Sequence, residues 1–176
     1  MDPNTPEHHV FLYYFFDYAT DTPPPPRTVP TSYELVYFKP SLSRLKLHTP
    51  ANSLVFLFWY FMTFGKYRIV YVKDGDVIIH FSIILPKYFK FPFIGPNDLE
   101  IGPCWTKEEY RGQGLYPAAL SYIIRKYQHT RVQRLFMFTR KPNVASQKGI
   151  LKVGFRPFGI GFKSRLGIYQ LTETFP

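Results

Sequence analysis

The sequence predicts a single α/β domain of the mixed (α+β) type, in which helices flank one central, mostly antiparallel sheet. The 176 residues are 45% hydrophobic and 19% charged, an ordinary composition for one globular domain with a sizeable core. After residue 33, short apolar runs alternate with segments of helical period. Asp74 and Gly75 stand between two of these runs and favour a hairpin, because a tight primed turn needs positive φ.

Residues 1–32 are expected to be an N-terminal extension. They contain an aromatic segment at residues 11–16 and then four consecutive prolines at residues 23–26. Proline lacks a backbone N–H and has a fixed φ, so this stretch excludes helix and central strand and favours an extended polyproline II arm. The folded domain is therefore predicted to span residues 33–176.

Within that domain the pattern predicts seven strands and three helices. The expected strands cover residues 33–38, 67–72, 77–84, 99–105, 135–138, 155–162 and 167–171. The expected helices cover residues 52–64, 115–127 and 143–153, with Gly65 and Gly154 as C-terminal stops.

The most apolar stretch, residues 54–64, is shorter than the roughly 20 residues that a membrane-spanning helix needs. We expect a core helix there and no membrane span; the alternatives are a membrane-surface helix or a dimer interface, so a homodimer stays open. The N-terminus has neither a basic segment nor a small-residue cleavage site, which favours a cytoplasmic protein.

The net charge of +10 attracts polyanions such as RNA, phospholipid surfaces and polyphosphate cofactors. No run of five basic residues occurs, so we expect no dedicated nucleic-acid tail and no nucleic-acid partner. Cys104 is the single cysteine, which rules out an intrachain disulfide and a Cys-based zinc site. We predict no metal.

The informative segment is residues 99–116, in which an apparent strand, a glycine-rich turn and a helix start follow one another. Backbone N–H groups of such a turn converge on one point, and the helix N-terminus adds partial positive charge. Gly112 and Gly114 allow an anion to approach the main chain, and Arg111 adds a cation. The segment therefore predicts a phosphate-binding turn.

Two motifs carry a resemblance to a known family. The run Arg111-Gly112-Gln113-Gly114-Leu115-Tyr116 resembles the Gln/Arg-x-x-Gly-x-Gly/Ala motif of the GNAT superfamily of N-acyltransferases, with Tyr116 where Gly or Ala is usual. Residues 143–146 and 152–155 resemble the later Asn-x-x-Ser and Lys-x-Gly-Phe signature.

The resemblance, which covers about residues 33–171, implies the GNAT-like acyl-CoA N-acyltransferase fold and an acyl-CoA-dependent enzyme. It implies acyl-CoA as the cofactor, acetyl-CoA by default and a longer acyl-CoA as an option. The residues that it assigns to coenzyme A are Trp105, Thr106, Arg111, Gly112, Gln113, Gly114, Leu115, Tyr116, Asn143 and Ser146. Pro103 is compatible with the strand bulge that the family has beside the pantetheine.

Two side chains are candidates for the general base that acyl transfer to an amine needs. Glu100 has apolar neighbours, so burial would raise its pKa, and many GNAT enzymes carry a carboxylate near this position; the alternative is a structural carboxylate. His80 could act as a base near neutral pH, and the alternative is a core histidine whose hydrogen bonds are satisfied. The family's usual tyrosine acid is absent, because Ile150 occupies its position.

The acceptor is expected to be a small amine, namely the amino group of a nucleotide-linked amino sugar. Residues 44–46, 87–93 and 155–165 are rich in aromatic and cationic side chains, which suit a planar base and a diphosphate. The residues around the turn also look similar to GNAT proteins of bacterial surface-polysaccharide pathways. The alternatives are a protein or small-molecule amine as acceptor, a CoA-binding module without turnover, and a basic RNA-binding protein on the same scaffold.

Overall fold

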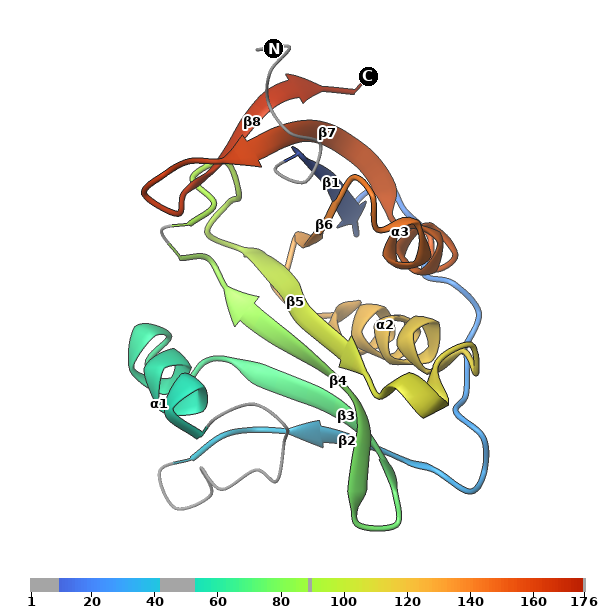
Figure 1. The fold of residues 1–176 in the computed structure, drawn as a ribbon. Coiled ribbons are helices and arrows are strands. Elements are labelled where there is room, and N and C mark those ends of the chain that lie inside the picture. The colour runs from blue at the N-terminus through green and yellow to red at the C-terminus, as the bar shows by residue number, and fades with distance from the viewer. Residues whose placement is uncertain (1–9, 42–52, 89, 176) are drawn as a thin grey trace.

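The structure is a computed structural model that describes residues 10–41, 53–88 and 90–175 (Figure 1). Its strands are β1 (Val10–Asp17), β2 (Glu34–Phe38), β3 (Arg68–Asp74), β4 (Val77–Pro86), β5 (Asp98–Thr106), β6 (Arg134–Arg140), β7 (Arg156–Lys163) and β8 (Tyr169–Thr174). Its helices are α1 (Ser53–Met62), α2 (Leu115–Tyr127) and α3 (Val144–Leu151), and a short 3₁₀ turn covers Glu108–Tyr110.

All strands belong to one sheet with the order β2-β3-β4-β5-β6-β1-β7-β8. Every neighbouring pair is antiparallel except β5 and β6, which are parallel. In Figure 1, α1 lies on the opposite side of the sheet from α2 and α3. The predicted mixed sheet, single domain and flanking helices are confirmed.

The parallel pairing of β5 with β6 is short and ends at Glu100. Only Asp98, Leu99 and Glu100 face partners on β6, whereas β5 continues to Thr106 alongside β4. Pro103 has no N–H for a ladder bond, and the β4–β5 register shifts between Ser82 and Ile84. The two central strands therefore diverge beyond Glu100, as the bulge expected at Pro103 implies.

The N-terminal boundary of the predicted domain needs correction. Residues 1–32 were expected to be an extension, but β1 lies inside the sheet, between β6 and β7. Tyr13 and Phe16, which point to opposite faces of β1, are both fully buried. A strand that is covered on both faces has a continuous apolar run rather than an alternating pattern, which is why the sequence did not reveal it. The fold therefore includes residues 10–17.

The proline-rich segment after β1 forms no helix or strand in the structure from residue 21 to residue 30, as predicted. It lies along α2, where Ser121 Oγ donates to the Pro25 carbonyl at 3.3 Å. At its end, Tyr33 Oη donates to Gln113 Oε1 at 3.0 Å. The arm therefore links the amino-terminal strand to the turn that precedes α2.

The hydrophobic core forms two layers, one on each face of the sheet. On one face, α2 and α3 pack through fully buried residues such as Leu120, Ile123, Ile124 and Ile150. The expected helix at residues 115–127 is therefore present and packs on this face of the sheet. On the other face, Trp59 of α1 packs on β3 and β4, and an aromatic cluster around Phe136 covers the region of β1 and β6.

The prediction of a core helix at residues 54–64 is wrong for most of α1. Among residues 57–64, only Trp59 and Thr63 are buried, and every other side chain is at least partly exposed. Residue 52, the first of the predicted helix, lies outside the described residues. No described helix is long and apolar enough to cross a membrane.

If β1 is part of the core, Phe16→Ala will destabilise the protein strongly. Phe16 is fully buried against Tyr18 and Phe155, so its truncation should cost about 3–5 kcal/mol of unfolding free energy in urea denaturation. Phe175→Ala, at a side chain that is 37% exposed, serves as the control and should cost less than about 1 kcal/mol. Equal costs for both variants would mean that β1 is peripheral.

Candidate functional site

A cavity of about 660 Å³ lies where β5 diverges from β6, between the start of α2 and α3. Its walls come from the end of β5, the turn after it, the first turn of α2 and one side of α3. Of the ten residues that the sequence assigned to coenzyme A, nine line this cavity. The exception is Gln113, whose side chain accepts the hydrogen bond from Tyr33 instead.

The turn before α2 has the backbone conformation of an anion-binding loop. Gly112 and Gly114 have φ of 79° and 78°, in a region of backbone conformation that residues other than glycine rarely adopt. A Cβ at either position would meet nothing within 4 Å, so the space beside both glycines is open to a ligand. Leu115 and Tyr116 precede the first intrahelical bond, from Ala118 N to Gly114 O at 3.0 Å, so their N–H groups can bind an anion.

Arg111 is placed at the rim of the cavity by two contacts. Its Nε donates to the Thr106 carbonyl at 3.3 Å, and its Nη1 lies 3.7 Å from the Glu108 carboxylate. The guanidinium is largely exposed, so the ion pair adds little stability. A cation at this position remains available to a phosphate.

On the opposite wall, the Asn-x-x-Ser motif has a clear structural role. Asn143 is the N-cap of α3, and its Oδ1 accepts a hydrogen bond from the Ser146 N–H at 3.1 Å. The Ser146 hydroxyl is within 3.4 Å of the Tyr116 hydroxyl. Asn143 therefore orients the helix start, while Ser146 presents a hydroxyl to the cavity.

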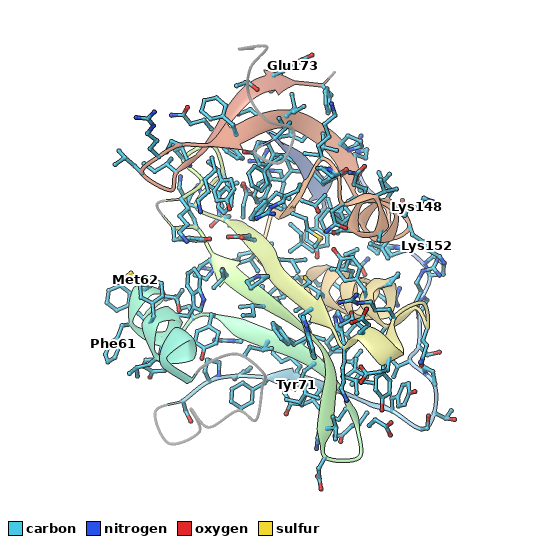
Figure 2. All side chains as sticks on the ribbon, in the orientation of Figure 1. Phe61, Met62, Tyr71, Lys148, Lys152 and Glu173 are labelled. Carbon is cyan, nitrogen blue, oxygen red and sulfur yellow. The ribbon has the colours of Figure 1, made fainter. Side chains whose placement is uncertain are left out.

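Sequence reasoning missed two basic residues of this wall. Lys148 and Lys152 line the cavity and project from α3 and its C-terminal end (Figure 2). Their spacing of four residues, which places both side chains on one helical face, is the signal that would have found them. Together with Arg111 they surround the cavity with three cations.

Tyr116 departs from the family motif, and its ring occupies a place that Gly149 leaves free. A Cβ on Gly149 would come within 2.6 Å of Tyr116 Cδ1. Glycine inside a helix is disfavoured by up to about 1 kcal/mol, but here it makes room for the ring. The tyrosine thus joins α2 to α3 and places its hydroxyl beside Ser146.

His80 is fully buried, and both of its ring nitrogens have partners. Nδ1 lies 2.7 Å from Thr106 Oγ1, and Nε2 lies 3.0 Å from Ser82 Oγ. Burial lowers the pKa of His80 to about 4, so the ring is neutral at pH 7. These contacts favour the interpretation of a satisfied core histidine that positions Thr106.

Glu100 is 2% exposed and lies at the point where the strands diverge. Burial raises the pKa of Glu100 to about 8, although its hydrogen bond with Tyr88 and the charge of Lys90 act in the opposite direction. Within the part of the chain that the structure describes, its Oε2 has no hydrogen-bond partner. The carboxyl is therefore mostly protonated at pH 7, and one of its oxygens is buried without a protein partner in the described structure.

Glu100 is not among the residues that line the cavity, whereas Cys104 is. The thiol lines the cavity, and burial is the main reason that the pKa of Cys104 rises to about 12, with the Glu100 charge adding to it. A protonated thiol is a poor nucleophile. Within the described residues, no group of three or more His, Cys, Asp or Glu side chains could hold a metal ion.

Comparison with known proteins gives the family. The profile of the Acetyltransferase (GNAT) family matches residues 33–155, which is 123 of the 176 residues. The chain therefore belongs to the GNAT family of acetyltransferases. A comparison with curated proteins gives no match.

Solved structures show the same fold at low sequence identity. A GCN5-related N-acetyltransferase from Sphaerobacter thermophilus superposes with a TM-score of 0.61 at 14% identity, over 86% of this chain and 49% of that one. A putative GNAT acetyltransferase from Novosphingobium aromaticivorans gives 0.56 at 15%, over 86% and 61%.

The structure of yncA, a putative acetyltransferase from Salmonella typhimurium with its cofactor acetyl-CoA, gives a TM-score of 0.53 at 16% identity, over 69% of this chain and 79% of that one. The first structures in this comparison are longer, and this chain spans about half to three fifths of them.

Because Tyr116 contacts Gly149, the effect of Gly149→Ala on the unfolding free energy should depend on whether Tyr116 is present. Gly149→Ala alone should lower the unfolding free energy by about 1–3 kcal/mol, because the new methyl overlaps the tyrosine ring. In a Tyr116→Ala background the same substitution should become neutral or stabilising by up to about 1 kcal/mol, since alanine favours helix. Denaturation of the four proteins in this cycle measures the coupling, and additive effects would contradict the contact.

Proposed function

We propose that this chain transfers an acyl group from acyl-CoA to an amine, with acetyl-CoA as the default donor. The observation that carries this is the cavity at the β5–β6 divergence, lined by nine of the ten residues expected to hold coenzyme A. The open space beside Gly112 and Gly114 fits a pyrophosphate that approaches the main chain. When bound, acyl-CoA supplies an activated thioester.

Different residues of the cavity would bind different parts of acyl-CoA. The N–H groups of residues 112–116 and the Arg111 cation would hold the pyrophosphate, whereas Lys148 and Lys152 add charge for the remaining phosphate. Trp105 and Thr106, at the end of β5 that no longer pairs with β6, would hold the pantetheine arm. Ser146 and the Tyr116 hydroxyl offer hydrogen bonds between the two helices.

For the proton that the acceptor amine must lose, Glu100 is the better candidate of the two predicted bases. Its Oε2 has no partner, whereas both nitrogens of His80 are engaged. The effect of the Glu100 charge on Cys104 indicates that the carboxyl is close to the cavity wall. His80 would act by holding Thr106.

As acceptor we propose the amino group of a nucleotide-linked amino sugar. Near Glu100, the loop after β4 and the β7–β8 hairpin meet, since Tyr169 N donates to the Lys90 carbonyl at 2.8 Å. The Tyr169 ring stacks on the Phe91 ring with 4.6 Å between their centroids. Lys163 Nζ lies 5.8 Å from the Tyr169 ring centroid. Aromatic rings with nearby cations suit a base and a diphosphate. The expected contribution of residues 44–46 lies outside the described residues.

The acceptor class is tested by thiol release from acetyl-CoA with a panel of amines. We expect release with nucleotide-linked 3-amino or 4-amino sugars, and a KM for acetyl-CoA that is about tenfold higher in Arg111→Ala, which removes a charge-assisted contact.

Two outcomes of the panel would contradict this assignment. Release with polyamines or a lysine peptide alone would replace the acceptor class. Binding of coenzyme A without turnover of any acceptor, longer acyl-CoAs included, would indicate a CoA-binding module and refute the enzymatic proposal.

The raised pKa of Glu100 predicts the pH dependence of the reaction. A base must be ionised, so kcat/KM should rise with pH and level off above the pKa of about 8. Glu100→Gln should lower kcat by about a hundredfold or more and remove this rise. Glu173→Gln, on exposed β8 (Figure 2), is the matched control and should change neither.

A Glu100→Gln enzyme with normal rates and an unchanged pH profile would show that this carboxyl is structural. In that case the buried carboxyl would have no role in proton transfer. Coenzyme A binding by the same variant, which should be unaffected, shows that the protein is folded.

A further inference from the structure

The exposed side of α1 carries large apolar side chains that nothing in the described structure covers. We call Leu57, Phe58, Phe61, Met62 and Phe64 the α1 surface; their exposed fractions are 36%, 47%, 60%, 49% and 87%. Figure 2 shows Phe61 and Met62 on α1, at the edge of the molecule. A contiguous apolar patch of this kind marks an interaction site in a folded protein.

The backbone at Phe64 provides a second, independent observation. Phe64 has φ of 51°, a left-handed conformation that is an outlier for a bulky residue and costs about 1 kcal/mol or more. Bonds from Gly65 N to Tyr60 O and from Lys66 N to Thr63 O close the helix end around it. Glycine or asparagine would make this turn without strain, and the ring gains no packing in return. A phenylalanine here is useful only if something outside the described structure covers it.

The chain segments that flank the α1 surface carry exposed lysines and, in the sequence, no acidic residue. The sequence has no Asp or Glu between residues 35 and 73 or between residues 77 and 97. Exposed lysines adjoin the helix: Lys66 follows α1, while Lys39 and Lys87 neighbour Phe38 and Tyr88, which pack in the same cluster as Trp59. An apolar centre with a cationic rim is complementary to an anionic surface that has an apolar interior.

We propose that the α1 surface binds the surface of a bilayer containing anionic lipids. The apolar side chains would enter the boundary of the acyl chains, and Lys39, Lys66 and Lys87 would meet the lipid phosphates. The ten-residue helix is too short to span a membrane, so it lies in the plane of the interface.

The charge pattern favours a lipid surface over the other occupants. In a two-fold dimer through α1, the same basic rim would face its own copy with no acidic partner, which is repulsive. A nucleic acid would satisfy the lysines and leave the five apolar side chains in water. An anionic bilayer satisfies both parts of the surface.

Binding through α1 would leave the acyl-CoA cavity accessible, because α1 and the cavity helices α2 and α3 cover opposite faces of the sheet (Figure 1). The inference does not depend on the acceptor proposed above. A failure of lipid binding and a failure of acyl transfer are therefore separate results.

Flotation with vesicles tests the proposal. The protein should float with vesicles of phosphatidylcholine containing 30 mol% phosphatidylglycerol, a composition chosen for the assay, and at least about tenfold less with phosphatidylcholine alone. Phe64→Asn should weaken binding by about tenfold, since burial of one aromatic ring is lost. Its thermal midpoint should stay equal or rise, because asparagine tolerates positive φ. Binding loss therefore cannot be confused with misfolding.

Matched variants separate the apolar and charge contributions. Phe61→Ser should weaken binding like Phe64→Asn, whereas Val77→Ser, 51% exposed at the β3–β4 turn, should not. Lys66→Glu should weaken binding about fivefold or more, whereas Arg131→Glu, which makes the same change in net charge after α2, should have a smaller effect.

Several results would overturn the proposal. One is the absence of flotation with anionic vesicles at low salt. Another is full binding by Phe61→Ser and Phe64→Asn, which would leave only non-specific charge attraction. A dimer in sedimentation that Phe61→Ser dissociates, without vesicle binding, would assign the surface to a second copy. RNA binding that requires Phe61, again without vesicle binding, would assign it to nucleic acid.

Discussion

The early end of the pairing between β5 and β6 is the constraint on which the functional architecture depends. Because these strands share only the pairs at Asp98, Leu99 and Glu100, the sheet opens in its middle rather than at an edge. The end of β5 then stays with β4, while β6 is held by β1 on its other side. Pro103 has no N–H to donate to a neighbouring strand, and the irregular β4–β5 register beside it lies where β5 and β6 part.

Helices α2 and α3 convert the opening into a binding site for an anionic cofactor. The turn before α2 offers backbone N–H groups on one side, and Asn143 fixes the start of α3 on the other. The ring of Tyr116 against Gly149 sets how closely the two helices approach. The same tyrosine that departs from the family motif therefore shapes the cavity, and the departure is matched by a glycine on the facing helix.

Burial gives the two ionisable candidates opposite properties. It keeps His80 neutral between two hydroxyl groups, whereas it holds a proton on Glu100 beside an oxygen that has no partner. Desolvation disfavours the charged form in both cases, which lowers the pKa of a base and raises that of an acid. Of these two side chains, only the carboxyl has a polar atom without a partner among the described residues. On the face of the sheet opposite α2 and α3, α1 presents an apolar and cationic surface that is separate from the cavity.

The sequence alone determined the sheet-and-helix architecture, the hairpin at Gly75, the glycine turn before α2 and most of the cavity wall, because these follow from local patterns. The turn needs a positive φ at positions 112 and 114, for example, and glycine adopts such a φ more readily than other residues. Only the tertiary structure decided the place of residues 10–17, since a strand buried on both faces has no alternation to reveal it and its partners are more than 100 residues away.

Tertiary packing also decided which face of α1 is buried, because an all-apolar helix gives no direction of its own. It brought Lys148 and Lys152 to the cavity and placed Glu100 and His80 in their different environments. These properties depend on which residues meet across the fold, and no local pattern in the chain encodes that.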